Sequence, residues 1–266
     1  MCRLAAYVGP PTPLSALLYD APHSLSHQAH SPREMFRGRV NVDGTGVAWW
    51  PEHGDGASPL RYVSDNPPWS DPNLPGLSAR LRAVMALAAI RNASPGVPYG
   101  VANVAPFTYD TLACAHNGSI GRFRESTGRE LTGRLPDDLY SALDTVSDSL
   151  VVFLTVVKHL ADNRGAGLAA ALKRATTEIL DVCAAADAAA TLNVVIADGE
   201  RLAAVRAARR TEGNNPMYLL EGGRRFPGGV VLASEPLDDD PAWQAIDDDS
   251  LVECSSEGVT VMRLDA

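Results

Sequence analysis

Residues 192–207, LNVVIADGERLAAVRA, contain the strongest short-range β pattern in the chain. Two runs of period two, Leu192–Ala197 and Arg201–Ala207, flank Asp198-Gly199, a dipeptide that favours the tight turn of a hairpin. Before the hairpin, apolar residues recur at helical spacing from Ser147 to about Asn163, and again over about 168–188. The sequence therefore predicts two long helices followed by a β-hairpin.

Short apolar runs on both sides of this block predict further strands. The first begins at the N-terminus itself, where Leu4, Ala6 and Val8 share one side and the run stops at Gly9-Pro10-Pro11. The other strands are expected at 46–50, 60–64, 84–91, 111–116, 217–220, 229–233, 251–254 and 259–264. Strands at both ends and helices in the middle indicate an α+β protein with helices packed on antiparallel sheets. We expect one domain, residues 2–266.

Composition and charge exclude several kinds of partner. The chain has 266 residues, and 45% hydrophobic with 21% charged is ordinary globular composition. Because 23 Lys and Arg face 32 Asp and Glu, the formal charge of -9 would repel a nucleic acid backbone. No apolar run approaches the roughly 20 residues that span a bilayer, and the N-terminus lacks a signal sequence. We expect a cytoplasmic protein that binds neither nucleic acid nor membrane.

The cysteines and histidines form no recognisable metal site. Four cysteines lie far apart without a CxxC pair, which argues against zinc and against a disulfide framework. Cys114, Cys183 and Cys254 lie in apolar elements and are interpreted as core or incidental residues. His23, His27 and His30 are interpreted as structural or as a pocket wall, and the acidic runs 238–240 and 247–249 as solvated surface. We predict no metal and no cofactor.

Cys2 is the residue best suited to act as a catalytic nucleophile. A residue this small permits removal of Met1, which would put a thiol and a free α-amine on one residue. An α-amine has an ordinary pKa of about 7.7 to 8.0, so it can act as the base for its own side chain. This is the arrangement of an N-terminal-nucleophile hydrolase. Taken alone, a buried structural cysteine in a first strand is the plainer and commoner explanation of position 2.

Three other positions offer complementary chemistry, each with a plainer explanation. His116-Asn117-Gly118 follows an apolar strand, where the Asn amide and the Gly N–H could serve an oxyanion, or simply form a turn. Arg91 ends a strand and could bind a carboxylate, or form a salt bridge at the sheet edge. Asp148 could bind an ammonium group, or favour the start of its helix.

The ordered set of motifs resembles the class II glutamine amidotransferase domain. That set comprises Met1-Cys2-Arg3, Asn41-Val42-Asp43-Gly44-Thr45-Gly46, Arg91-Asn92-Ala93-Ser94, Asn103-Val104-Ala105-Pro106-Phe107, His116-Asn117-Gly118 and Ser147-Asp148-Ser149. Four further stretches, Pro22-His23-Ser24-Leu25, Ser31-Pro32-Arg33-Glu34-Met35, 69–75 and Ala233-Ser234-Glu235-Pro236 followed by 239–243, resemble the EgtC family. These are the γ-glutamyl hercynylcysteine sulfoxide hydrolases of ergothioneine biosynthesis. The resemblance runs nearly the full length.

The resemblance implies a fold, a reaction and a set of site residues. The fold is a four-layer αββα sandwich, and the reaction releases glutamate through a γ-glutamyl thioester on Cys2. Asn117 and Gly118 would be the oxyanion donors. The substrate-binding residues would be Arg91 for the α-carboxylate, Asp148 for the α-ammonium, Asn103 as a pocket-shaping residue, and also Ser94 and His116.

Departures from the family pattern lie near the substrate. They are Leu4, Asn92, Ser119 and Leu150, so the non-glutamyl half of the substrate rests on the resemblance alone. Three alternatives stay open: a glutaminase subunit that supplies ammonia to a partner synthase, a catalytically silent γ-glutamyl-binding module, and an α+β domain with a structural Cys2. The expected partner is a small-molecule γ-glutamyl substrate, and the sequence leaves a homo-oligomer open.

Overall fold

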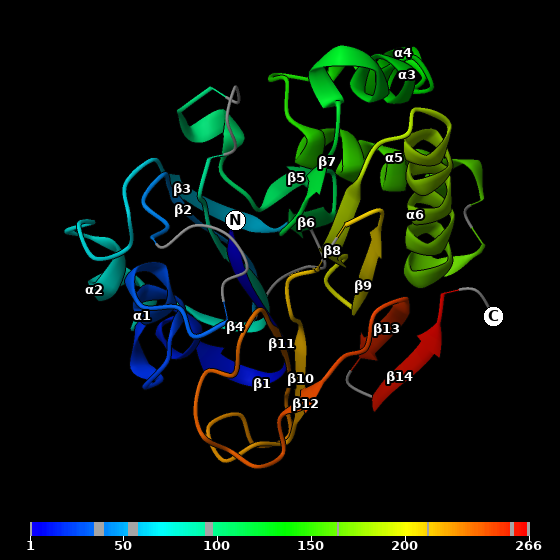
Figure 1. Cartoon of the computed structure of the whole chain (residues 1–266). Coiled ribbons are helices and arrows are strands. Elements are labelled where there is room, and N and C mark those ends of the chain that lie inside the picture. The colour runs from blue at the N-terminus through cyan, green and yellow to red at the C-terminus, as the bar shows by residue number, and fades with distance from the viewer. Residues whose placement is uncertain are drawn as a thin grey trace.

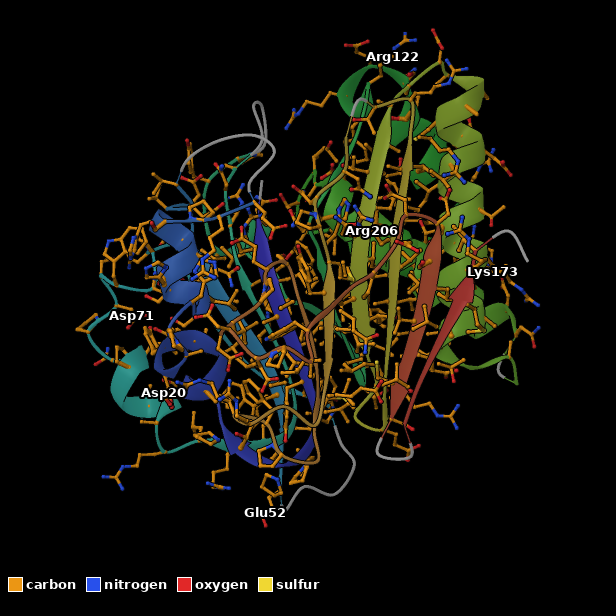
Figure 2. The ribbon with its side chains drawn as sticks, turned by 60° about the horizontal axis from the view of Figure 1, so that its bottom comes forward. Asp20, Glu52, Asp71, Arg122, Lys173 and Arg206 are labelled. Carbon is orange, nitrogen blue, oxygen red and sulfur yellow. The ribbon has the colours of Figure 1, made fainter. Side chains whose placement is uncertain are left out.

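The computed structural model describes residues 2–34, 40–52, 58–93, 98–163, 165–211, 213–255 and 258–264. Two antiparallel sheets face each other, and helices cover their outer faces (Figure 1). Asp20 and Asp71 lie among the helices on one side and Lys173 on those of the other (Figure 2). The predicted α+β fold, a four-layer αββα sandwich, is confirmed.

The first sheet contains the N-terminal strand at its centre. Its strands, in spatial order, are β12 (Gln244–Ala245), β10 (Tyr218–Glu221), β11 (Val230–Ala233), β1 (Arg3–Pro13), β4 (Arg82–Ile90), β2 (Thr45–Pro51) and β3 (Leu60–Ser64). On its outer face lie η1 (Ala16–Asp20), α1 (Leu25–His30) and α2 (Leu74–Ser78). Because β1 pairs with both β4 and β11, the residue just before it emerges from the middle of the sheet.

The second sheet is built around the predicted hairpin. Its strands, in spatial order, are β14 (Gly258–Arg263), β13 (Ser250–Ser255), β9 (Arg201–Arg209), β8 (Ala190–Ala197), β6 (Leu112–His116) and β5 (Phe107–Tyr109), and β7 (Ser119–Ile120) also pairs with β8. The long helices α5 (Asp148–Asp162) and α6 (Gly167–Ala185) pack on its outer face. The shorter helices between β4 and α5 in the chain are η2 (Val101–Asn103), η3 (Phe123–Thr127), α3 (Gly128–Thr132) and α4 (Asp137–Ser141).

Three apolar cores separate the four layers. Along β1, Leu4, Ala6 and Val8 point into the core between the sheets, whereas Ala5 and Tyr7 point into the core beneath α1 and η1. This is the period-two alternation predicted from the sequence, applied to a strand that is buried on both faces. Many side chains between the sheets are alanine, so the two backbones pack closely. Burying this strand on both sides holds its first residues in place.

All the strands and both long helices predicted from the sequence are present, with boundaries that differ by a few residues. The predicted end of the first strand is wrong, because β1 continues through Gly9-Pro10-Pro11 to Pro13. Its register with β4 shifts between Val8 and Thr12, an irregularity at which prolines without N–H donors are tolerated. The short elements η1, α1, α2, β5 and β12 were not predicted, since their lengths carry little periodicity.

Candidate active site

Cys2 lies at the head of β1 and opens into a cavity between the edges of the two sheets. Its side chain is half-buried, and its Sγ lies 3.9 Å from the carbonyl oxygen of Asn92. The residues that line this cavity come from both sheets and from the start of α5. They are Cys2, Ala89, Ile90, Arg91, Asn92, Asn103, Ala105, Phe107, His116, Gly118, Ser147, Asp148 and Ser149. Six residues predicted for the site thus share one cavity.

Arg91 presents an unused donor in this cavity. Its Nη2 donates to the carbonyl of Pro98 at 2.9 Å, whereas its buried Nη1 has no hydrogen-bond partner among the described residues. The backbone after β4 is held by Asp43, whose Oδ2 accepts from the Ala93 N–H at 2.7 Å, and by Gly44, whose carbonyl accepts from the Arg91 N–H at 2.8 Å. A buried, unpaired guanidinium N–H is costly unless an anion binds it.

Asp148 places a carboxylate on another wall of the cavity. It begins α5, and its Oδ2 accepts from the Ile120 N–H at 3.0 Å while its Oδ1 accepts from the Ser149 N–H at 2.8 Å. These contacts fix the side chain. Oδ1 also lies 3.4 Å from the Ser149 hydroxyl, whereas Oδ2 accepts only from Ile120 among the described residues and retains a lone pair for a ligand. The cavity therefore combines a cationic and an anionic group, which suits a zwitterionic ligand.

His116 is held by contacts on both ring nitrogens. Its Nε2 lies 3.0 Å from the carbonyl oxygen of Thr191, which can only accept, so Nε2 carries the proton. Its Nδ1 lies 3.0 Å from Ser149 Oγ, a hydroxyl that is also within hydrogen-bond distance of Asp148 Oδ1. Because both nitrogens are occupied within the protein, His116 lines the cavity as a fixed wall and is not free to act as a base.

Asn117-Gly118 joins the second sheet to the first. The Asn117 side chain is fully buried, its Oδ1 accepts from Asn215 Nδ2 at 3.0 Å, and its Nδ2 donates to Ser234 Oγ at 3.3 Å. The second N–H of the same amide has no partner among the contacts of the described residues. At Gly118 a Cβ would lie 1.9 Å from the carbonyl oxygen of Thr191, so no side chain fits. This approach brings the backbone of Gly118 against β8.

Asn103 lines the cavity and makes two side-chain hydrogen bonds. Its Nδ2 donates to the Pro98 carbonyl at 3.0 Å, the same oxygen that Arg91 contacts, and its Oδ1 accepts from Thr145 Oγ1 at 3.0 Å. The pocket-shaping role of Asn103 stays a prediction. Ser94, the remaining predicted binding residue, lies outside the described residues, as does Met1.

Comparison with known proteins identifies the family. Residues 14–221 match the sequence model of the class-II glutamine amidotransferases. The chain belongs to this family. Two relatives are named gamma-glutamyl-hercynylcysteine sulfoxide hydrolase. The one from Mycobacterium tuberculosis is 34% identical over 100% of this chain and 97% of its own. The one from Mycolicibacterium smegmatis is 33% identical over 99% of this chain and 100% of its own.

A solved structure supports the same fold. The glutamine aminotransferase class-II domain protein from Silicibacter pomeroyi superimposes with a TM-score of 0.69 at 23% identity, covering 99% of each chain. The two full-length relatives confirm the predicted resemblance to the γ-glutamyl hercynylcysteine sulfoxide hydrolases. The predicted enzyme class, a cysteine-dependent N-terminal-nucleophile amidohydrolase, is also confirmed.

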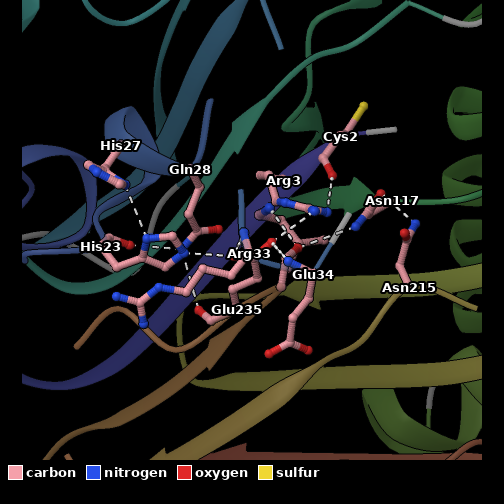
Figure 3. A network of polar contacts seen from close by, with 12 residues as sticks. Cys2, Arg3, His23, His27, Gln28, Arg33, Glu34, Asn117, Asn215 and Glu235 are labelled. Atoms are coloured by element: carbon pink, nitrogen blue, oxygen red, sulfur yellow. Dashed lines mark hydrogen bonds and ion pairs between the residues drawn. The ribbon is translucent and has the colours of Figure 1, made fainter. Parts of the chain in front are cut away.

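Behind Cys2, this class II amidotransferase contains a buried ion-pair network (Figure 3). Arg3 and Glu235 are both fully buried and approach to 2.9 Å, and His23 Nε2 lies 2.6 Å from the other carboxylate oxygen. Burial opposes ionisation of Glu235, but hydrogen bonds from His23 and from two backbone amides, with the charge of Arg3, outweigh it and lower its pKa to about 2. Burial lowers the pKa of Arg3, and Glu235 counteracts this effect.

This ion-pair network was not predicted from the sequence, although Arg3, His23 and Glu235 all lie in motifs named in the sequence analysis. His23, interpreted from the sequence as structural or as a pocket wall, is fully buried, and Ser234-Glu235 is named there only within a motif that resembles the family. Asn215, which orients the amide of Asn117, was not singled out. Its contact spans 98 positions in the sequence, so no local pattern could reveal it.

The other three cysteines differ from Cys2 in their surroundings. Cys114, Cys183 and Cys254 are buried free thiols. Burial raises the pKa of Cys183 to about 11 and of Cys254 to about 12, and raises that of Cys114 further. Thiols held in their neutral form are poor nucleophiles. Among the described residues, no three His, Cys, Asp or Glu side chains are grouped so as to hold a metal ion, and no helix is long and apolar enough to cross a membrane.

Proposed function

We propose that this protein hydrolyses the γ-glutamyl amide bond of γ-glutamyl hercynylcysteine sulfoxide and releases glutamate, a step of ergothioneine biosynthesis. The observation that carries the proposal is the single cavity lined by Cys2, by Asp148 and by Arg91, whose buried Nη1 is unpaired among the described residues. The two full-length hydrolase relatives support the choice of substrate.

The glutamyl half of the substrate would be recognised by charge. Arg91 Nη1 would bind the α-carboxylate, and Asp148 would bind the α-ammonium group. Charge-assisted hydrogen bonds of this kind contribute about 1.5 to 3 kcal/mol each when buried. A substrate that lacks either group would leave a buried charge unpaired, so the site selects γ-glutamyl compounds. Ser94 stays a predicted contact.

Cys2 would act as the nucleophile once Met1 is removed. Its α-amine takes the thiol proton, and the thiolate attacks the γ-carbonyl carbon. The resulting oxyanion accepts hydrogen bonds from Asn117 Nδ2 and the Gly118 N–H. When the intermediate collapses, the C–N bond breaks, and the leaving amine takes the proton from the α-ammonium of Cys2. This leaves a γ-glutamyl thioester.

Water would complete the cycle. The α-amine of Cys2 accepts a proton as water attacks the thioester carbonyl, and the same two donors hold the second oxyanion. Collapse of this intermediate breaks the C–S bond and releases glutamate, and the thiolate regains its proton from the α-ammonium. Neither step requires a histidine base, which fits the fully occupied ring of His116.

The test is glutamate release by the processed chain from γ-glutamyl hercynylcysteine sulfoxide, glutamine and other γ-glutamyl compounds. We expect fastest turnover of the sulfoxide conjugate, and loss of at least about 10³-fold in Cys2→Ala, comparable with the loss of other catalytic nucleophiles. Cys183→Ala, which removes a buried thiol elsewhere, is the matched control. Undiminished turnover by Cys2→Ala would overturn the proposal. Binding without turnover would indicate a silent module, and glutamine hydrolysis that rises sharply with a second protein would indicate an ammonia supplier.

A further inference from the structure

The nucleophile and the predicted oxyanion donors belong to different sheets. Cys2 precedes β1 of the first sheet, and Asn117-Gly118 follows β6 of the second. The core between these sheets is apolar, and apolar packing is non-directional, so by itself it does not fix one sheet against the other to a fraction of an ångström. Attack on a carbonyl requires reacting atoms at about 3 Å with donors in place. Directional contacts between the sheets are therefore needed at this point.

Ser234 makes such a contact. It follows β11, is buried, and its N–H donates to the Leu4 carbonyl at 2.9 Å. Its Oγ accepts from the Leu4 N–H at 3.0 Å and from the Asn117 Nδ2 at 3.3 Å. The Ser234 hydroxyl oxygen thus accepts one hydrogen bond from β1, the strand that follows Cys2, and one from the Asn117 amide that would hold the oxyanion.

Glu235, the next residue, holds the backbone of Cys2 through Arg3. The Arg3 Nη1 donates to the Cys2 carbonyl at 3.3 Å, and its Nη2 lies 2.9 Å from Glu235 Oε1. The Glu235 carboxylate is itself fixed by the backbone N–H groups of Arg33 and Glu34, at 2.8 Å and 3.0 Å, and by His23. Figure 3 shows Glu235, Arg3 and Cys2 in succession, with Asn117 and Asn215 beside them.

We propose that Ser234 and Glu235 are positioning residues that hold Cys2 and Asn117 in register across the two sheets. Ser234 sets the place of the Asn117 amide relative to β1, and Glu235 sets the place of Cys2 through Arg3. The inference rests on the proposed function, in which Cys2 attacks and Asn117 stabilises the oxyanion. It assigns neither residue a direct contact with substrate.

Ser234→Ala tests the first half. The change removes one oxygen, while Asn215 still holds the Asn117 Oδ1. Loss of an entire oxyanion donor costs about 10²- to 10³-fold in kcat, so we expect a loosened donor to cost roughly 10- to 100-fold, with KM unchanged within about twofold. Alkylation of Cys2 by iodoacetamide forms an S–C bond and expels iodide without an oxyanion, so its rate should stay at the wild-type value. Ser234→Thr, which keeps the hydroxyl, should recover most of the activity.

Glu235→Gln tests the second half. The change keeps the shape but leaves the charge of Arg3 uncompensated beside Cys2, which favours proton loss from both the thiol and the α-ammonium. The acidic limb of the kcat/KM profile should therefore move to lower pH, whereas a packing defect would lower the plateau without moving the limb. The charged and titratable groups around the carboxylate are Arg3 on β1, His23 and His27 at α1, Glu34, and Tyr218 on β10.

Two controls separate the possible failures. Ser78→Ala removes another buried hydroxyl, one that bonds only the Pro75 carbonyl at 3.2 Å among the described contacts, and should leave kcat unchanged. If Cys2→Ala retains activity, the proposed function fails. If Cys2→Ala is inactive but Ser234→Ala keeps the wild-type kcat, or Glu235→Gln keeps the wild-type pH profile, the inference fails. Should Glu235→Gln not fold, Ser234→Ala decides the question alone.

Discussion

Arg91→Lys is expected to lower kcat/KM for γ-glutamyl substrates by about 10- to 140-fold. The guanidinium of Arg91 uses Nη2 for the Pro98 carbonyl, and its buried Nη1 has no partner among the described residues, which leaves Nη1 as the donor proposed for the α-carboxylate. A lysine ammonium keeps the charge but lacks the planar fork, so it cannot make both contacts in the same geometry. Loss of one charge-assisted hydrogen bond costs about 1.5 to 3 kcal/mol, which is roughly the stated factor at 1.4 kcal/mol per tenfold.

The assay is glutamate release, compared with hydrolysis of the corresponding γ-aminobutyryl amide, which lacks the α-carboxylate. The variant should lose activity on the γ-glutamyl compound and little on the analogue. Arg82→Lys is the matched control, because Arg82 begins the same strand and also donates to a proline carbonyl, that of Pro11, at the opposite end. Equal losses on both substrates, or none on either, would refute the assignment of Arg91 to the carboxylate.

Three further outcomes follow from the structure. Gly118→Ala should abolish turnover, because its Cβ would lie 1.9 Å from the Thr191 carbonyl oxygen; wild-type rates would contradict the close approach to β8. Protein whose intact mass shows retained Met1 should be inactive, and removal of Met1 by an aminopeptidase should restore turnover; an active unprocessed chain would rule out the α-amine as base. Glu235, with its pKa lowered from 4.5 to about 2, should contribute stability of roughly 3 kcal/mol that is complete above pH 4.5 and lost as pH falls toward 2. Urea unfolding should show a steeper acid loss in wild type than in Glu235→Gln, and parallel loss would contradict it.

The main fold elements were predictable from sequence because their patterns are local. The alternation of Leu4, Ala6 and Val8 and the helical spacing after Ser147 each record which side chains share one face of an element. The turn at Asp198-Gly199 adds the chain reversal of the hairpin, with Gly199 at φ 96°. Short elements such as α1 and β12 span too few residues to show a period, so they emerge only from packing.

In the candidate site too, the individual residues could be predicted from local sequence, whereas their grouping could not. Cys2, Arg91, Asn117-Gly118 and Asp148 stand at the ends of predicted elements, where the chemistry of each side chain could be judged individually. The cavity that brings most of them together depends on which strands are neighbours, and strand order is not a local property. From the sequence, only the resemblance to a family indicated that these residues form one site.

The sequence by itself determined the main element types and the family and predicted the nucleophile, since each depends on residues close together in the chain or on motifs in a fixed order. Only the tertiary structure decided what holds the nucleophile in place. The contact of Ser234 with Leu4 spans 230 positions, and that of His23 with Glu235 spans 212. Such contacts are selected by the packing of β11 beside β1 and of the two sheets against each other, which no local pattern encodes.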